Sequence, residues 1–377
     1  MLLGVLLSVA QAAELGGYFR VQARPDWMEG DGRLGTSSLY GRLMNEGPWA
    51  LVDLRQDLVK RTPGGDDPWG DLHLRVEGGA IGNADASSGN LASFRMSQFY
   101  LQAGNVALEG VTWRVGTLET TFGDLWLYDT RPTQMFVDVL GAQATWKKGK
   151  TQVDLAVGDA GWSTYGLDYR SLPSGGGAVR QGLGEHLDVG IGAQTWVLGD
   201  DLGYKIAGYV GFGKLGALTW DRVQVVYKRP LADPASPRRS DQRAELFVGN
   251  ELELDLGDLD VAWATQLART TDADAPKTDR TAVSTVVRGQ VEVAPTVAVL
   301  AETAVGRELD AVATRDTWQG KGGLVLSPAG GGMGARPALR FLYGAQYSTA
   351  PAAWPGAAPR EQSKWHHLVA VEAETWF

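Results

Sequence analysis

The feature that most restricts the fold is a repeated alternation of apolar and charged residues along the chain. In "DLHLRVEGG", every second residue from Leu72 to Val76 is aliphatic, and the alternate residues from Asp71 to Glu77 are polar or charged. The same period recurs in "RAELFVGNELELDL" and in the C-terminal "HLVAVEAETWF". A period of two indicates β-strands, because successive side chains of a strand point to opposite faces of the sheet. Long amphipathic helical patterns are lacking, so the sequence predicts an all-β protein.

The composition of the two strand faces points to a membrane rather than to a soluble sandwich. In strand after strand the polar face carries Arg, Asp and Glu. The other face is aliphatic over about nine to eleven positions, a length that crosses a bilayer when the strand is tilted. An apolar outside and a charged inside are typical of a wide barrel that holds water. We therefore predict a transmembrane antiparallel β-barrel, with a secreted soluble β-protein as the alternative.

The connections between strands also follow a pattern. Short turns are expected at "KKGK", "LGDD", "LGDLD" and "VAPT", and long loops at 25–37, 82–92, 160–185, 229–242, 270–280 and 349–363. Barrels of the outer membrane have short periplasmic turns and long external loops. About seventeen strand candidates lie between Glu14 and Phe377, and bacterial barrels have an even number. The prediction is therefore 16 or 18 strands, with one strand either overlooked or counted in excess between Gly199 and Trp220. A barrel of this size leaves an aqueous channel.

The N-terminal segment "MLLGVLLSVAQAAE" is an apolar run that closes with small residues in an A-x-A pattern. This pattern predicts a signal peptide over 1–13 and one barrel domain over 14–377, and a short buried segment is the alternative. The chain has no cysteine, which excludes disulfides, zinc–thiolate sites and a lipidated N-terminus. After the N-terminal run no stretch of 18 uncharged apolar residues follows, so no transmembrane helix is expected.

The charge and the scarcity of reactive side chains narrow the function classes. The net charge is −9, and nucleic acid is not an expected partner because phosphate binding needs a basic surface. The adjacent His366 and His367 point to opposite strand faces and make a poor metal site. A G-x-S-x-G motif is absent, and no strong nucleophilic triad is seen. We expect neither metal, cofactor nor enzymatic activity, and a barrel with an enzymatic or adhesive role remains the alternative.

One long connection differs from the others. The stretch "GTLETTFGDLWLYDTRPTQMF", from Gly116 to Phe136, mixes aromatic and charged residues without alternation. In a wide barrel such a loop can fold inward and narrow the pore, whereas the alternative is a loop on the outer surface. An inward-folded constriction loop would place five side chains at the narrowest point: Asp124, Trp126, Tyr128, Asp129 and Arg131.

Several short motifs match one known family of channels. They are Tyr18-Phe19-Arg20 in the opening strand, the run from Arg42 to Glu46, Trp49, Phe94-Arg95, the stretch from Asp124 to Asp129, and the penultimate Trp376. In these positions the chain resembles the maltoporin-type sugar porins. The similarity spans the chain and is densest over 14–150 and 336–377.

The resemblance implies a passive channel for sugars such as maltooligosaccharides. It also implies a homotrimer surrounded by lipid in the outer membrane of a Gram-negative bacterium. Sugar rings would stack on an aromatic lane formed by Tyr18, Trp49, Trp126 and Trp376. Sugar hydroxyls would bind a polar lane formed by Arg20, Arg42, Arg95, Asp124 and Asp129, with Tyr128 also lining the channel. The alternative within the same class is a general porin, in which charged walls set only charge selectivity.

The last strand offers an independent check on this interpretation. Alternation places Tyr18 and Trp376 on the polar, inward face of their strands. Closure of a barrel makes the first and last strands neighbours, so the two aromatics should lie side by side. Phe377 falls on the opposite, lipid-facing row, where aromatic residues form the interfacial girdle.

Overall fold

The structure, a computed structural model, describes residues 13–23, 34, 37–62, 65–79, 94–160, 171–198, 201–229, 243–273, 279–311, 313–349 and 365–377. Nearly all of the signal peptide predicted over 1–13 lies outside these residues.

The described residues form eighteen strands joined into one antiparallel sheet. The strands are β1 (Glu14–Ala23), β2 (Trp49–Val59), β3 (Trp69–Gly79), β4 (Phe94–Gly104), β5 (Val111–Thr120), β6 (Met135–Lys148), β7 (Thr151–Asp159), β8 (Pro173–Gly182), β9 (Leu187–Leu198), β10 (Asp201–Leu215), β11 (Leu218–Arg229), β12 (Arg243–Asp255), β13 (Leu259–Asp272), β14 (Arg280–Ala294), β15 (Val297–Asp310), β16 (Thr314–Leu326), β17 (Ala338–Ser348) and β18 (Trp365–Trp376). Two short helices accompany them, α1 (Ser37–Tyr40) and the 3-10 helix η1 (Trp126–Tyr128). Among the described residues, no helix is both long enough and apolar enough to span a membrane.

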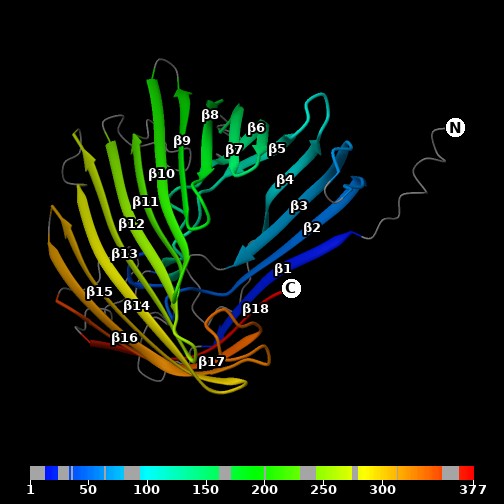
Figure 1. The fold of residues 1–377 in the computed structure, drawn as a ribbon. Helices are drawn as coiled ribbons and strands as arrows, with labels where there is room; N and C mark the ends of the chain where they lie inside the picture. Colours follow the sequence, from blue (N-terminus) through cyan, green and yellow to red (C-terminus); the bar gives the residue numbers. More distant parts are fainter. Residues whose placement is uncertain are drawn as a thin grey trace.

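The sheet closes on itself between its first and last strands. Each strand pairs with its neighbours in the sequence, and β1 pairs with both β2 and β18. Figure 1 shows the blue β1 beside the red β18, where the ring of strands closes. In this pairing Tyr18 lies directly opposite Trp376, as the alternation predicted. The predicted all-β antiparallel barrel and its even number of strands, here 18, are therefore confirmed.

Two details of the strand assignment were wrong. The segment 160–185, expected to be a loop, contains β8 with the sequence "PSGGGAVRQG". Its three consecutive glycines have no side chains that could show the alternation, so the sequence pattern missed it. The short turn at "LGDD" was expected at the same end of the barrel as "KKGK". It joins β9 to β10 and therefore lies at the opposite end from "KKGK", which joins β6 to β7. The region from Gly199 to Trp220, where the missing strand was sought, holds β10 and the start of β11.

The alternation of side chains separates an apolar outer wall from an inner wall. On β7, Leu155 and Val157 are 62% and 64% exposed, whereas Asp154 and Ala156 between them are 1% and 3% exposed. The same contrast recurs around the barrel, and the exposed face carries most of the large hydrophobic residues. In a barrel of the transmembrane type this exposed apolar face is the surface that contacts lipid.

Two connections fold into the barrel. The β1–β2 segment comprises Leu34 and residues 37–48, and the β5–β6 segment comprises residues 121–134. Their apolar side chains pack against the inner faces of β6 to β18 and form three buried clusters. We call β6 to β18 the covered arc, and β2 to β5 the open arc.

The inner wall of the covered arc accommodates these segments with very small residues. A Cβ atom at Gly249 would lie 2.8 Å from Cδ1 of Leu125 in the β5–β6 segment. A Cβ at Gly344 would overlap Leu34, and one at Gly192 would overlap Met135. Glycine leaves room at these positions for Leu125 and Leu34 of the inner segments and for Met135 at the start of β6, and a larger residue would force these side chains to move.

Candidate functional site

The β5–β6 segment crosses the lumen and attaches to the far wall. Its tip is closed by a pair of backbone hydrogen bonds between Leu125 and Thr130, of 2.8 and 3.3 Å. The backbone N–H of Leu127 donates to Glu251 Oε2 on β12 at 3.1 Å. Leu125 and Leu127 are fully buried in the second cluster. The predicted inward-folded constriction loop is therefore present.

Tyr128 does not have the position expected of a channel-lining residue. Its side chain is fully buried beneath the β5–β6 segment. Its hydroxyl donates to the backbone oxygen of Ala264 at 3.3 Å and accepts from Ser284 Oγ at 3.2 Å. Because its ring and its hydroxyl both contact the covered arc, Tyr128 anchors the β5–β6 segment and does not line the channel.

The β1–β2 segment approaches the β5–β6 segment from the other side. The backbone N–H of Arg42 donates to the backbone oxygen of Leu127 at 2.7 Å. Lys321 Nζ on β16 donates to the backbone oxygen of Tyr40 at 2.9 Å. Burial raises the pKa of Tyr40 above its usual range, so its hydroxyl keeps its proton and donates to Glu308 at 3.1 Å. The two segments thus support each other and the wall holds both.

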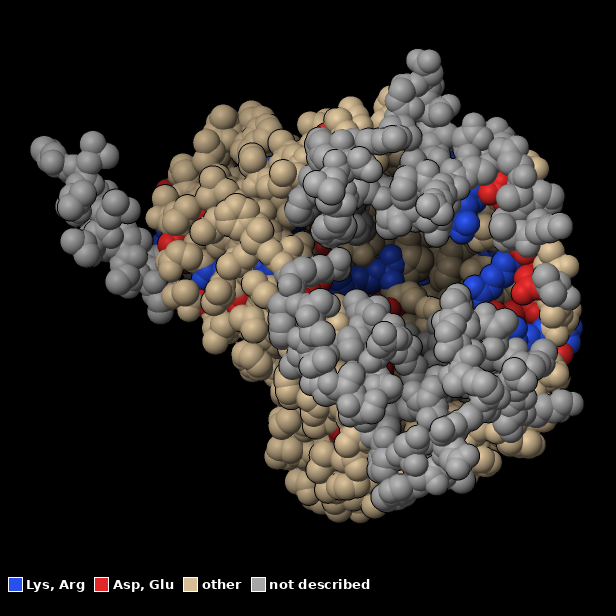
Figure 2. Space-filling model, turned by 180° about the vertical axis from the view of Figure 1, so that it is seen from behind, with Lys and Arg blue, Asp and Glu red and all other residues tan. Residues whose placement is uncertain are grey.

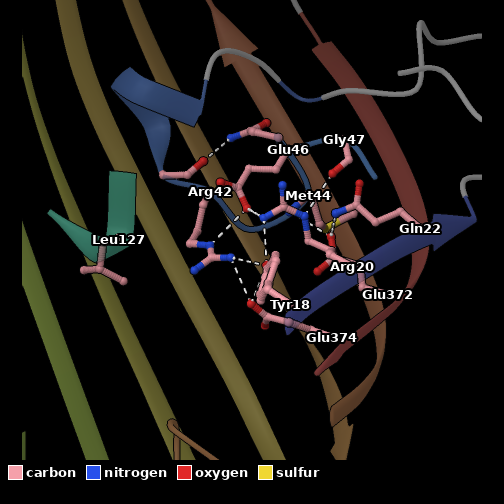
Figure 3. Close-up of polar contacts among 12 residues, drawn as sticks. Tyr18, Arg20, Gln22, Arg42, Met44, Glu46, Gly47, Leu127, Glu372 and Glu374 are labelled. Atoms are coloured by element: carbon pink, nitrogen blue, oxygen red, sulfur yellow. Dashed lines mark hydrogen bonds and ion pairs between the residues drawn. The ribbon is translucent and has the colours of Figure 1, made fainter. Parts of the chain in front are cut away.

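Carboxylates and guanidinium groups are interleaved where the two segments meet β1 and β18 (Figure 3). Glu46 Oε2 accepts from Arg42 Nε at 3.0 Å and also from Arg20. Arg42 Nη2 reaches Glu374 Oε1 on β18 at 2.9 Å. The hydroxyl of Tyr18 donates to the same Glu374 oxygen at 2.8 Å. All of these side chains except that of Tyr18 are at most 11% exposed.

Two more arginines bind the other oxygen of Glu374. Arg340 Nη2 on β17 and Arg336 Nη2, in the turn before β17, both lie 2.7 Å from Glu374 Oε2. Glu374 therefore balances three guanidinium groups. A buried charge of this kind is stabilised only while its partners remain, because desolvation of an unpaired ion is costly.

A second carboxyl lies close to Glu46. Glu46 lies outside the membrane-spanning strands, and burial together with a hydrogen bond to Asp129 raises its pKa to about 8. The pKa of Asp129 is lowered: burial opposes this shift, but the hydrogen bond with Glu46 and the positive charge of Arg42 outweigh it. Burial thus favours the protonated form of Glu46, while the positive charges of Arg42 and Arg20 oppose it, at the contact between the two inner segments.

Arginines lie over two of the four aromatic residues expected to form the sugar lane, Trp126 and Trp376. Trp376 is 50% exposed, and the guanidinium carbon of Arg336 lies 4.7 Å from its ring centroid. The ring of Trp126 has two such neighbours, Arg288 at 4.8 Å and Arg42 at 5.7 Å. These cation–π contacts use ring surface on which a sugar would stack.

The remaining predicted residues are more dispersed. Trp49 is the first residue of β2 and lies opposite Arg20 on β1. Arg95 on β4 lies opposite Glu77 on β3. The side chain of Arg95 is outside the part of the chain that the structure describes. Asp124 and Arg131 are exposed on the β5–β6 segment. Asp129 ends η1 in the left-handed conformation, with φ of 51°. Solvent reaches part of this residue, although its carboxyl group lies against Glu46 and Arg42.

Two arginines of the ion network, Arg336 and Arg340, were not predicted. Alternation places Glu372 and Glu374 on the inward face of β18 together with Trp376, and it would have placed Arg340 on the inward face of β17 in the same way. Arg336 lies in a turn, where no periodicity reports side-chain direction.

The open arc supplies the opposite wall of the passage. Its inner charges are paired across neighbouring strands: Arg75 Nε lies 2.9 Å from Asp53 Oδ1, and Arg55 Nη2 lies 2.9 Å from Asp71 Oδ2. The side chains of Arg55 and Arg75 are 38% and 23% exposed. Figure 2 shows a hollow in which Lys, Arg, Asp and Glu gather, while much of the visible outer wall is of other residue types. Within the described ranges, no group of three or more His, Cys, Asp or Glu side chains could hold a metal ion.

Comparison with known proteins relates the chain to outer-membrane barrels by fold. No family model matches the sequence, and no curated protein matches it. Among solved structures, a BenF-like porin from Pseudomonas fluorescens Pf-5 is similar, with a TM-score of 0.55 and 9% identity over 98% of this chain and 100% of that one. OccAB2 of Acinetobacter baumannii has a TM-score of 0.51 and 11% identity, covering 97% of each chain. An anion-selective porin from Comamonas acidovorans has a TM-score of 0.50 and 14% identity, covering 97% and 99%. At these identities the likeness establishes the barrel fold.

Proposed function

We propose that the protein is a passive diffusion channel for small polar solutes in the outer membrane of a Gram-negative bacterium. The observation that carries the proposal is that the two inner segments meet inside the barrel, through the hydrogen bond from Arg42 to Leu127, opposite a charged and partly exposed open arc. A passage of this kind selects solutes by width and charge, and it requires no covalent chemistry. Two of the similar structures are porins, which supports the same class.

The geometry favours a general channel over one built for sugars. A stacking lane needs free aromatic faces, but guanidinium groups lie over Trp126 and Trp376. The hydroxyl of Tyr18 is already bonded to Glu374. The charged side chains of the open arc, by contrast, remain partly exposed to the lumen.

A sugar channel remains the second candidate because of one observation. Tyr18 and Trp376 lie opposite each other where the barrel closes, and half of the Trp376 surface is exposed. If Arg336 moved aside, the two rings would form a short stacking platform. Maltooligosaccharides are the sugars to test first, since the family resemblance implies them.

Planar-bilayer recording distinguishes the two candidates. For a general channel we expect stable ohmic conductance, a reversal potential that depends on the salt gradient, and no concentration-dependent block by maltohexaose. Saturable block by maltohexaose that Trp376→Ala weakens would establish the sugar channel instead. Trp113→Ala, which removes an outward-facing tryptophan of similar exposure, is the matched control. Absence of any conductance from correctly folded protein would contradict both candidates.

The homotrimer implied by the family resemblance is a separate proposal. Native mass spectrometry in mild detergent, together with chemical cross-linking of whole membranes, measures it directly. Three chains per particle would support the proposal, whereas a single chain under both conditions would contradict it.

A further inference from the structure

A pocket on the inner wall lies between the covered arc and the two inner segments. Its volume is about 540 Å³, within the range of small-molecule sites. Strands β12 to β16 supply its wall, and the inner segments contribute Leu39 and Pro132. Phe247 in the pocket lies nearer than Glu251, which holds Leu127, to the end of β12 that is away from the chain termini. A solute that enters from that end therefore reaches the pocket before the contact between the inner segments.

Strand register arranges part of the lining in two rows across the inner face. The outer row is polar, lies near the strand ends and consists of cross-strand neighbours on β13, β14 and β15: Thr270, Arg280 and Asp310. The row below it is apolar and consists of cross-strand neighbours on β12, β13 and β14: Phe247, Ala268 and Ala282. The small side chains of the two alanines leave space beneath the charged row. The pocket is therefore polar toward the end of the barrel and apolar toward the constriction.

The charged side chains of the pocket differ in how accessible they are. Glu308 is 14% exposed, and it accepts from the hydroxyl of Tyr40 at 3.1 Å and lies 3.5 Å from Arg315 Nη1. Arg280 also pairs with Glu308, but through Nη2, and its side chain is 53% exposed. A guanidinium group has five N–H donors, so this pair leaves donors of Arg280 for a ligand. Asp310 is exposed as well, and a carboxylate accepts several hydrogen bonds at once.

The balance of these charges selects the class of solute. Two arginines and two carboxylates line the pocket: Arg280, Arg315, Glu308 and Asp310. A solute with one charge would be attracted by one member of the exposed pair and repelled by the other. A dipolar solute, by contrast, places each of its charges against the opposite one. Arg280 and Asp310 lie directly opposite each other on β14 and β15, with Cα atoms about 4.5–5.5 Å apart, so the two charges of the solute must also be close together.

We propose that the pocket binds zwitterionic α-amino acids that have an apolar side chain. The carboxylate of the ligand accepts hydrogen bonds from Arg280, and its ammonium group donates to Asp310. Both groups are attached to the same carbon atom, which matches the short separation of the two charges in the pocket. The side chain of the ligand lies below them, against Ala268, Ala282 and the ring of Phe247. The proposal rests on the channel proposed above and names a class of solute that this channel admits.

The test is a titration of the purified full-length barrel, in neutral detergent, with L-leucine, followed by saturation-transfer NMR. We expect saturable binding that Arg280→Gln and Asp310→Asn each weaken about five-fold, the upper end for a partly exposed charge pair. Ala268→Leu fills the apolar row and should weaken binding to a similar extent without altering charge. Arg55→Gln on the open arc and Ala301→Leu on the outer face of β15 are the matched controls and should leave binding unchanged.

Two analogues of L-leucine decide whether both of its charges are recognised. Isocaproate lacks the ammonium group and isoamylamine lacks the carboxylate, so each should bind wild type about five-fold more weakly than L-leucine. In Asp310→Asn the loss of the ammonium group should cost little more, and in Arg280→Gln the same holds for the carboxylate, since each change removes the same contact. Binding of either analogue as tight as that of L-leucine, equal losses in the pocket variants and the two controls, or no saturable binding would overturn the proposal.

Two measurements separate this site from folding and from the channel itself. Heat-modifiable gel migration shows that each variant is folded. Conductance of wild type in bilayers without binding of L-leucine would contradict the amino-acid site alone. Binding of L-leucine with the expected losses in the pocket variants, by a wild type that conducts no ions, would contradict the channel and support the site.

Discussion

The inner faces of the covered arc and the open arc differ in residue size and in how their charges are held. On β15, in the covered arc, the inward Ala298 and Ala304 are fully buried, and Glu302 is only 3% exposed. On β2 and β3, in the open arc, Arg55 and Arg75 keep part of their surface in the lumen. The covered arc therefore acts as a seat for the two inner segments, and the open arc acts as a wall of the passage. The following predictions change one arc at a time.

The largest effect is expected at Glu374, which joins the covered arc to β1 and the β1–β2 segment. Glu374→Ala leaves Arg42, Arg336 and Arg340 without this partner. Removing one member of a buried ion pair costs roughly 3–5 kcal/mol. Urea unfolding followed by gel migration should show the loss, with Glu14→Gln, an exposed residue of β1, as the control. Equal stability of the two variants would mean that the network does not hold the segments.

A smaller loss is expected from adding one methyl group to the covered arc. A Cβ at Gly192 would overlap Met135, whereas a Cβ at the outward Gly175 meets its nearest atom at 3.5 Å. Overpacking of this kind costs about 1–3 kcal/mol. Gly192→Ala should lower the unfolding midpoint and increase current noise in bilayers. Gly175→Ala should do neither, and a similar response of both variants would contradict the close packing of Met135, at the start of β6, against Gly192 on β9.

In the open arc we expect a change of selectivity with little change of stability. Arg75→Gln breaks the pair with Asp53, and partly exposed pairs contribute about 0–1 kcal/mol. Loss of this positive charge should shift the reversal potential in a salt gradient toward cation preference. Asp53→Asn is the matched variant and should shift the potential in the opposite direction. If Arg75→Gln lowered stability as much as Glu374→Ala does, the charges of the open arc would stabilise the fold as strongly as those of the covered arc, which would contradict the difference between the two arcs.

The smallest effect concerns pH at the contact between the inner segments. With its pKa raised to about 8, Glu46 is protonated below that pH and ionises beside Asp129 above it. The raised pKa favours the folded state at low pH, and this contribution is lost as pH rises through about 8. Bilayer currents should therefore become noisier as pH rises from about 7 to about 9, the range over which a group with this pKa loses its proton. Glu46→Gln imitates the protonated form and should abolish the change, and a variant with the same pH response would assign it to another group.

Much of the barrel could be predicted from alternation alone. The inward row of β18, including Glu374 and Trp376, and the pairing of Tyr18 with Trp376 follow from a period of two and from closure. The inward direction of the β5–β6 segment was also readable, because its aromatic and charged residues do not alternate. The glycine-rich β8 was missed, since alternation is carried by side chains and glycine has none.

The sequence by itself determined which strand face meets lipid and which meets the lumen, because side-chain period and polarity are local properties of the chain. Only the tertiary structure decided that Tyr128 is buried against β13 and β14 while Trp126 lies beside Arg42 and Arg288. It also decided that Arg336 lies over Trp376. These contacts join residues far apart in the chain, and the loop paths that bring them together depend on packing space left by small residues on distant strands.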